Sequence, residues 1–284
     1  MGEYVSPRTT NLRPRGFASV TRRRIDAELA ERGLFPSREQ ARAAVLAGEV
    51  RVGGQVVTKA GQPVEPDSII EVADRQRFVS RGGDKLAGAL DRFGLDVAGV
   101  RAVDVGASTG GFTDCLLKRG AVSVVAVDVG YGQLAWSLRT DPRVTVVERT
   151  NIRAADPGQL GAPFDMAVVD VSFISLRTVI PHVAELVGEA GQFVALVKPQ
   201  FEAGKGRVGK RGVVKDAAVH VDVLDAASEA ARGAGFVVRG LTFSPIKGPE
   251  GNIEFWLWAA RTGEPAAVTA CEVVNEAHAM LGGQ

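Results

Sequence analysis

Residues 102–114 constrain the fold more than any other stretch of the chain. Their sequence, AVDVGASTGGFTD, begins with small and β-branched apolar residues around a single acid, Asp104, and continues into a glycine-rich turn. The apolar run predicts a buried parallel strand over residues 100–105. Gly106 and Gly110 would let the backbone pass close beneath a ligand before a helix begins. A strand that leads into such a turn is typical of a site for a nucleotide-like cofactor.

The spacing of the glycines distinguishes between cofactors. Ser108 stands between Gly106 and Gly110, so the G-x-G-x-x-G fingerprint of dinucleotide sites is absent. The next predicted strand, residues 122–127, ends in Asp128, which is suited to accept hydrogen bonds from ribose hydroxyls. We therefore expect S-adenosylmethionine, and a purely structural glycine corner is the alternative. The expected cofactor-binding residues are Gly106, Ser108, Thr109, Gly110, Gly111, Asp128, Asn151 and Asp170.

Beyond Asp128, predicted strands and helices alternate. Strands are expected at 144–147, 166–169 and 193–197, and helices at 179–187 and 216–232. This alternation predicts an α/β fold with a doubly wound, Rossmann-like sheet. Residues 236–243 and 253–259 form two more strands with no helix between them, which predicts an antiparallel pair that closes the sheet.

The chain has a different pattern between residues 21 and 73. Two short helical patterns are followed by a hairpin with a Gly53-Gly54 turn and by a further strand. The segments RRRID, SREQAR and GEVRV occur here in that order. Their order and spacing resemble the small α+β RNA-binding domain named after ribosomal protein S4. The resemblance implies phosphate contacts from five arginines, the first two entering the first helix: Arg22, Arg23, Arg38, Arg42 and Arg51.

Two segments are strongly basic, although the net charge of the chain is only +1. Residues 1–24 contain six arginines and one acid, and residues 198–215 contain six basic side chains and one acid. Both are candidates for contact with nucleic-acid phosphates, and a solvated surface is the alternative for each. The second is rich in glycine and predicts a loop that holds RNA through Lys205, Arg207, Lys210 and Arg211.

Asp170 and Lys198 stand at the carboxyl ends of predicted strands, where open parallel sheets bind ligands. A lysine in such a crevice can take the proton of a ribose hydroxyl that is being methylated. From the residues alone, a structural ion pair explains the two side chains equally well. Phe173 and Phe201 are candidates for stacking on a flipped base, although packing is the commoner role of aromatic residues there.

Four motifs spread along the chain carry a closer resemblance. They are SRGGDKL at 80–86, VDVSFISL at 169–176, VKPQFE at 197–202 and GNIEF at 251–255. Together they resemble the TlyA family of ribosomal RNA 2′-O-methyltransferases over about residues 22–260, with a catalytic domain of the FtsJ-like type. The resemblance implies an S-adenosylmethionine-dependent enzyme that methylates cytidine riboses in the RNA of small and large ribosomal subunits.

The same resemblance implies a catalytic set of two lysines and two acids: Lys85, Asp170, Lys198 and Glu254. In this hypothesis Lys198 activates the 2′-hydroxyl, Lys85 stabilises developing negative charge, and the two acids orient the lysines. Without the family, Lys85 and Glu254 would pass for ordinary surface charges.

We expect five parts along the chain. They are a basic tail at 1–20, the S4-like domain at 21–73, a linker at 74–80, the methyltransferase domain at 81–262 and a C-terminal extension at 263–284. Neither Cys115 nor Cys271 lies in a metal or disulfide motif, so no metal site is expected. An apolar stretch of about eighteen residues and a secretion signal are both absent, which favours a cytoplasmic protein without membrane contact.

Three other functions fit parts of the pattern. Some members of the TlyA family are called haemolysins, so a membrane-lytic protein is one alternative. A non-catalytic RNA-binding factor for ribosome assembly is the second. The third is RNA pseudouridine synthesis, because similar RNA-binding domains precede such enzymes, but it leaves the glycine loop and Asp128 without a role. The oligomeric state is left open by the sequence.

Overall fold

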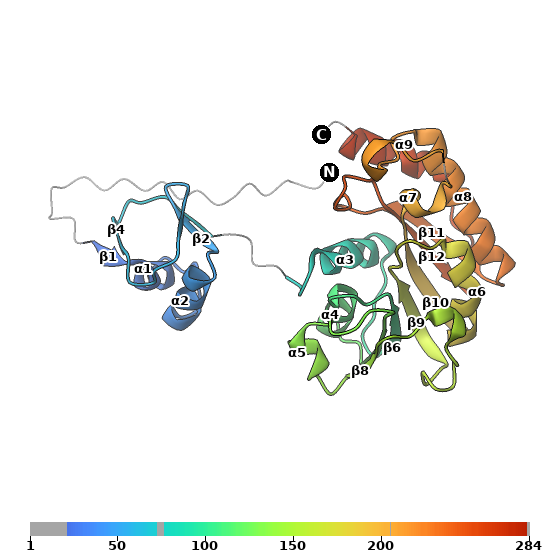
Figure 1. Ribbon diagram of the computed structural model, residues 1–284, viewed down its shortest axis with the longest axis horizontal. Coiled ribbons are helices and arrows are strands. Elements are labelled where there is room, and N and C mark those ends of the chain that lie inside the picture. Colours follow the sequence, from blue (N-terminus) through green and yellow to red (C-terminus); the bar gives the residue numbers. More distant parts are fainter. Residues whose placement is uncertain (1–21, 73–76, 205, 283–284) are drawn as a thin grey trace. The chain divides into compact units, whose positions relative to one another are not determined.

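The structure of the protein, a computed structural model, describes residues 22–72, 77–204 and 206–282. The chain divides into a smaller unit, residues 1–76, and a larger unit, residues 77–284 (Figure 1). Each unit has its own hydrophobic core, and the two are described separately below.

The smaller unit packs two short helices against short strands. Its elements are β1 (Arg23–Arg24), α1 (Ile25–Glu31), α2 (Arg38–Leu46), β2 (Val50–Val52), β3 (Gln55–Val57), β4 (Pro63–Val64) and β5 (Ile70–Val72). The strands form a sheet in the order β3-β2-β5 and a separate pair, β1-β4. The Ser37 hydroxyl caps α2 by accepting a hydrogen bond from the Gln40 amide at 3.2 Å. Ile25, Leu29 and Val45 are fully buried between these elements.

One detail of the expected S4-like unit was wrong. Arg22 and Arg23 do not enter the first helix, because Arg23 and Arg24 pair as a short strand with Val64 and Pro63. The helix α1 begins only at Ile25.

The larger unit is built on one seven-stranded sheet. In chain order its strands are β6 (Arg101–Val105), β7 (Ser123–Val127), β8 (Val144–Val147), β9 (Phe164–Val169), β10 (Val187–Val197), β11 (Val237–Phe243) and β12 (Phe255–Ala260). The spatial order is β11-β12-β10-β9-β6-β7-β8. The pairs from β10 to β8 are parallel, whereas β12 is antiparallel to both β10 and β11. The expected doubly wound sheet with an antiparallel pair at its end is confirmed.

Helices cover both faces of this sheet (Figure 1). They are α3 (Arg81–Phe93), α4 (Gly111–Lys118), α5 (Trp136–Arg139), α6 (Leu176–Leu186), α7 (Pro199–Glu202), α8 (Ala217–Gly233) and α9 (Ala270–Leu281). Successive strand residues point to opposite faces. In β6, Val103 and Val105 therefore join the core under α6, α8 and α9, and Ala102 joins the core under α3 and α4.

Both ends of the larger unit contain structure that the sequence did not predict. Phe78 is 4% exposed and packs in the core beneath α3, so the chain is anchored before that helix begins. The C-terminal extension contains α9, for which no element was predicted. Val273, Val274 and Ala277 of α9 are buried in the core on the α6 and α8 face.

The start of α9 provides a test of how firmly this added helix is held. Thr269 and Glu272 form a capping box: the Glu272 amide donates to the Thr269 hydroxyl at 3.3 Å, and the Thr269 amide donates to the Glu272 carboxylate at 2.8 Å. We expect Thr269→Ala to destabilise the first turn of α9 by about 1 kcal/mol. Thr269→Ser keeps the hydroxyl and serves as the control. Hydrogen exchange of the α9 amides checks this, and equal exchange in the two variants would contradict it.

Candidate active site

The loop between β6 and α4 is shaped by two glycines with positive φ. Gly106 has φ +89°, and a Cβ atom there would lie 2.3 Å from the backbone oxygen of Asp170. Gly110 has φ +95°, and its Cβ would lie 2.3 Å from a methyl group of Leu138. A side chain at 106 would clash with the backbone of Asp170, and both positions have a positive φ that side chains other than glycine rarely adopt, so the loop favours glycine at both.

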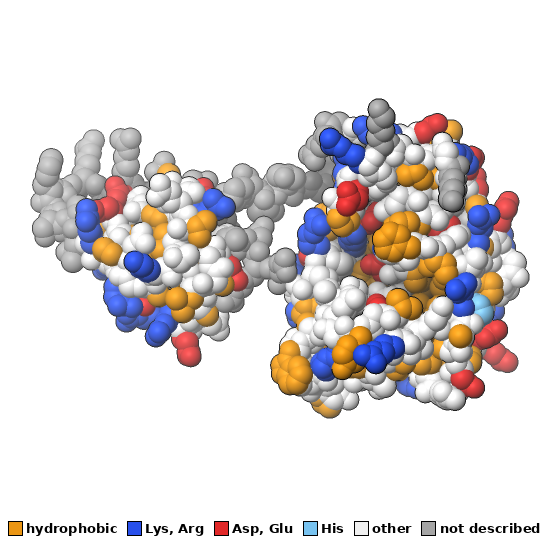
Figure 2. Space-filling view, viewed as in Figure 1, with side chains coloured by type: hydrophobic (Ala, Val, Ile, Leu, Met, Phe, Trp, Pro, Cys, Tyr) orange, Lys and Arg blue, Asp and Glu red, His pale blue; other side chains and the backbone are white. Residues whose placement is uncertain are grey.

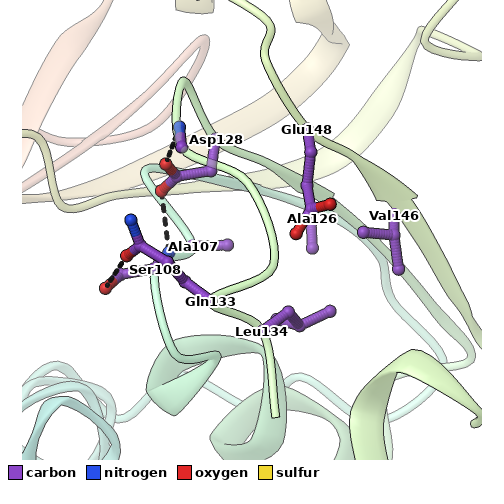
Figure 3. A pocket seen from close by; sticks show the side chains of 9 residues that line it. Ala107, Ser108, Ala126, Asp128, Gln133, Leu134, Val146 and Glu148 are labelled. Carbon is purple, nitrogen blue, oxygen red and sulfur yellow. Dashed lines mark hydrogen bonds between the residues drawn. The ribbon is translucent and has the colours of Figure 1, made fainter. Parts of the chain in front are cut away.

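Asp128 holds the same loop from the end of β7 (Figure 3). One carboxylate oxygen accepts the Ser108 amide at 2.8 Å, and the other accepts the Gly130 amide at 2.6 Å. Behind these contacts, Leu134 and Val146 line a small apolar pocket. An acid at the end of the second strand offers carboxylate oxygens that can accept hydrogen bonds from the ribose hydroxyls of an adenosyl group.

A cavity of about 610 Å³ lies over the carboxyl ends of the central strands. Figure 2 shows a hollow in this face of the larger unit, where acidic and basic side chains lie close together beside hydrophobic ones. Loops after β6, β9 and β10 contribute to its wall, together with the first turn of α3 and the segment before β12. The cavity is therefore placed where open parallel sheets bind ligands.

Lys198 and Asp170 form the first of two ion pairs in the cavity. Lys198 Nζ lies 2.5 Å from Asp170 Oδ1 and donates to Ser172 Oγ at 2.9 Å. The two side chains are 12% and 23% exposed, so a ligand in the cavity can still reach them.

Lys85 and Glu254 form the second ion pair, which is more deeply buried. Lys85 Nζ donates to Glu254 Oε2 at 2.5 Å, and the two side chains are 10% and 1% exposed. Lys85 comes from α3, whereas Glu254 lies just before β12 and is 169 positions away. Removing either partner would leave a buried charge uncompensated, which costs several kcal/mol in comparable pairs, roughly 3–5.

The structure brings all four expected catalytic residues to one cavity, and it distributes the expected cofactor residues over two. Gly106, Ser108, Thr109, Gly111 and Asp170 line the large cavity, while Ser108 and Asp128 line the small pocket. Gly110 lines neither and packs against Leu134 and Leu138. Asn151 also lines neither, and its side chain caps the short 3₁₀ helix Ile152–Ala154 by accepting from the Arg153 amide at 3.1 Å.

The expected RNA-binding arginines of the smaller unit differ in their partners. Arg22 pairs with Glu65 at 2.5 Å, Arg23 with Glu31, and Arg38 with Asp26 at 3.4 Å. Arg51 donates to the Gly54 carbonyl at 3.1 Å. Arg42 is exposed, and no ion pair joins it to another residue that the structure describes.

In the glycine-rich loop of the larger unit, Lys205 lies outside the described residues, and so does the side chain of Lys210. Arg207 pairs with Asp222 of α8. Arg211 is exposed and has φ +66°. Two apolar or small members of this loop, Val208 and Gly212, line the large cavity.

Several residues of the site were not predicted from sequence. Ser80, Arg81, Gln200, Pro249 and Glu250 line the large cavity. Only their places within or next to the recognised motifs could have suggested them. Asp104 is the one acid of an apolar strand, but the sequence predicts no role for it.

Asp104 lies directly beneath the glycine loop. It is fully buried, and one of its oxygens accepts the Thr113 amide at 3.0 Å and the Thr113 hydroxyl at 2.7 Å. Burial raises the pKa of Asp104 to about 7, against the lowering effect of the Thr113 hydrogen bonds, and the nearby charge of Asp170 raises it further. The other oxygen has no hydrogen-bond partner among the described residues.

This raised pKa predicts a pH-dependent stability. Between about pH 4 and pH 7 the folded protein keeps a proton on Asp104 that the unfolded chain has lost, so stability falls as pH rises. Asp104→Asn cannot ionise. From about pH 5 to about pH 7, we expect its free energy of unfolding to gain about 2 kcal/mol relative to the unsubstituted protein. Urea unfolding at several pH values checks this, with exposed Asp225→Asn as the control. Parallel pH curves for Asp104→Asn and the unsubstituted protein would contradict it.

No described helix is both long and apolar enough to cross a membrane. This holds for the described part of the chain, which includes every helix named above.

Comparison with known proteins places this geometry in a family. Residues 78–261 match the model of the FtsJ-like methyltransferases, and residues 23–70 match the S4 domain. The chain is 48% identical to the 16S/23S rRNA (cytidine-2′-O)-methyltransferase TlyA of Mycobacterium tuberculosis, over 90% of this chain and 96% of that protein. It is 46% identical to the putative rRNA methyltransferase YqxC of Bacillus subtilis, over 91% of this chain and 95% of that one.

A solved structure supports the same assignment. The putative hemolysin from Streptococcus thermophilus superposes with a TM-score of 0.71 at 42% identity, covering 93% of this chain and 98% of that one. The expected combination of domains and the expected family are both confirmed. The chain belongs to the TlyA family, in which an S4 domain precedes an FtsJ-like methyltransferase domain.

Proposed function

We propose that this methyltransferase transfers a methyl group from S-adenosylmethionine to the 2′-hydroxyl of a cytidine ribose in ribosomal RNA. The observation that carries the proposal is the pair of lysine–carboxylate contacts on one cavity, next to the glycine loop. The 48% identical relative, whose printed name states this reaction, supports the same substrate.

The residues present fit the proposed cofactor. The loop held by Asp128 offers backbone close to the large cavity, and beside Asp128 the side chains of Leu134 and Val146 line a small pocket that would have to widen to admit an adenine ring. Asp128 would accept hydrogen bonds from the ribose hydroxyls. When bound, S-adenosylmethionine supplies an electrophilic methyl group on a positively charged sulfur.

Lys198 would act on the attacking hydroxyl. A 2′-hydroxyl is a weak nucleophile until its proton is removed, and Lys198 in its neutral form can accept that proton. Asp170 and Ser172 hold the amine within 2.5 and 2.9 Å, which limits the directions in which its remaining valences point. These two residues would therefore position the base rather than react.

Lys85 would supply fixed positive charge close to the reacting oxygen. Its ammonium is held by buried Glu254, so it cannot swing out to solvent. A charge that is already oriented stabilises developing negative charge without reorganisation during the reaction. Such a catalytic role would account for the burial of this pair, which adds little to stability by itself.

The RNA would be held by basic and aromatic side chains around the cavity and on the S4 domain. Arg42 and Arg51 of the smaller unit are exposed, as are Arg207 and Arg211 of the glycine-rich loop. Phe173, at the cavity, is 90% exposed with φ +63°, and its ring centroid lies 4.9 Å from that of Phe201. An exposed aromatic ring held in a strained backbone conformation is suited to stack on a flipped base.

We extend the proposal to RNA of both ribosomal subunits, since the relative that covers 90% of this chain is named for 16S and 23S rRNA. Acting on assembled subunits would place the protein in the cytoplasm. The test is to supply each subunit separately, from cells that lack this modification.

Replacement of Lys198 tests the proposed base. We expect Lys198→Ala to slow methyl transfer by roughly a thousandfold, because general base catalysis contributes about 10²- to 10⁴-fold. The binding of S-adenosylmethionine should change little, because the glycine loop and Asp128 are untouched. Transfer of tritiated methyl groups to each subunit, followed by mapping of the modified nucleotides, measures the first effect, and calorimetry measures the second.

Lys118→Ala is a suitable control, because Lys118 is a surface lysine of α4 that pairs with Asp114 and does not line the cavity. Undiminished methylation by Lys198→Ala would refute the role of Lys198. If the unsubstituted protein binds the subunits but transfers no label to either, it is a non-catalytic RNA-binding factor, and the proposed reaction is wrong.

A further inference from the structure

The glycine-rich loop beside the cavity rejoins the body of the larger unit at Val214, which is 2% exposed. Both backbone groups of Val214 are held by side chains. Its amide donates to Asn252 Oδ1 at 2.9 Å, and its carbonyl oxygen lies 3.2 Å from His220 Nε2. Asn252 Nδ2 in turn donates to the carbonyl of Gly212 at 2.9 Å. The end of the loop is thus fixed by two buried side chains rather than by a strand.

One of those side chains connects the loop to the C-terminal helix. His220 of α8 is fully buried, and its Nδ1 lies 2.9 Å from Nε2 of His278 in α9. Burial, with a smaller contribution from His278, lowers the pKa of His220 to about 4, so its ring is neutral at neutral pH. If Nε2–H of His220 donates to the Val214 carbonyl, Nδ1 must accept a hydrogen bond, and the Nε2–H of His278 supplies it. A directed chain of hydrogen bonds therefore runs from α9 to the loop.

The same imidazole ring also contacts β12. The centroid of the His220 ring lies 5.1 Å from that of Phe255, with the rings close to edge-on. Phe255 follows Glu254, the buried partner of Lys85. On the loop side, Val208 and Gly212 line the cavity. His220 therefore lies between α9 and two residues, Val214 and Phe255, that follow the cavity-lining residues Gly212 and Glu254 in sequence.

We propose that His220 and His278 are positioning residues for methyl transfer, through which the C-terminal helix holds the cavity wall of residues 208–214 in place for the RNA. This inference rests on the function proposed above. A wall that is free to move would bind a large RNA substrate less well, because ordering the loop then costs conformational entropy on binding. The cofactor contacts proposed above come from the loop after β6 and from Asp128 after β7, not from residues 208–214, and should stay intact.

The test uses three variants of the full chain. His278→Ala removes the donor to His220. His278→Gln restores it, because the glutamine amide can place an N–H near the position of the histidine Nε2. Met280→Ala, at an exposed position of the same helix, is the matched control. Each variant is measured by hydrogen exchange of residues 206–214, by KM and kcat on ribosomal subunits, and by S-adenosylmethionine affinity.

For His278→Ala we expect faster exchange at the Val214 amide and a KM for the subunit that rises about tenfold, in keeping with the loss of one buried hydrogen bond. The S-adenosylmethionine affinity should stay within about twofold, and His278→Gln should recover most of both losses. The inference is overturned if His278→Ala matches Met280→Ala in exchange and in KM. It is also overturned if exchange rises while KM does not change, or if His278→Gln fails to recover either loss.

The exchange measurement distinguishes this inference from the proposed function. It reports on the link from α9 to Val214 even if the protein methylates no subunit. If the unsubstituted protein transfers no methyl group, the proposed function is refuted, and so is the role of His220 and His278 in methyl transfer. Normal transfer together with unchanged exchange in His278→Ala refutes the positioning role alone.

Discussion

The parallel pairing of β6 with its two neighbours is the constraint on which the site depends. In the sheet register, Val105 stands opposite both Val127 of β7 and Val169 of β9. The residues that follow these three, Gly106, Asp128 and Asp170, therefore emerge at one edge of the sheet. Since β10 is also parallel to β9, Lys198 emerges at the same edge and meets Asp170. Strand register, rather than proximity in sequence, assembles the site.

The pairing also explains why the strand ends tolerate so little change. The Cβ of any residue at 106 would meet the backbone of Asp170 at 2.3 Å, so the glycine that shapes the loop also permits β9 to approach. Asp104 is buried in the middle of the same strand and ties β6 to α4 through Thr113. The glycine loop, α4 and β9 are thus joined to β6 by a few contacts. A substitution that shifts one of them is expected to shift the others.

Buried ionisable groups reduce the stability of this fold at a few positions. Three buried sites hold ionisable groups: the ion pair of Lys85 and Glu254, Asp104 with its raised pKa, and the neutral imidazole of His220. Apolar residues at these places would avoid the free-energy cost of burying polar groups. Lys85 and Glu254 line the large cavity, Asp104 stands two positions before the lining residue Gly106, and His220 contacts the end of the loop that contributes Val208 and Gly212. Their concentration there fits a site that needs oriented charge and fixed hydrogen bonds.

The sequence by itself determined the fold class, the two-domain order and the family, because apolar periodicity, glycine turns and contiguous motifs are local properties of a chain. It misplaced Arg23 and predicted no α9, since a two-residue strand and an added C-terminal helix are stabilised by distant partners, Val64 and the face under α6 and α8. Only the tertiary structure decided that Lys85 meets Glu254 across 169 positions and that His278 reaches Val214 through His220. Such contacts depend on which strand ends and helix faces the sheet order brings together, and that order is a property of the packed fold.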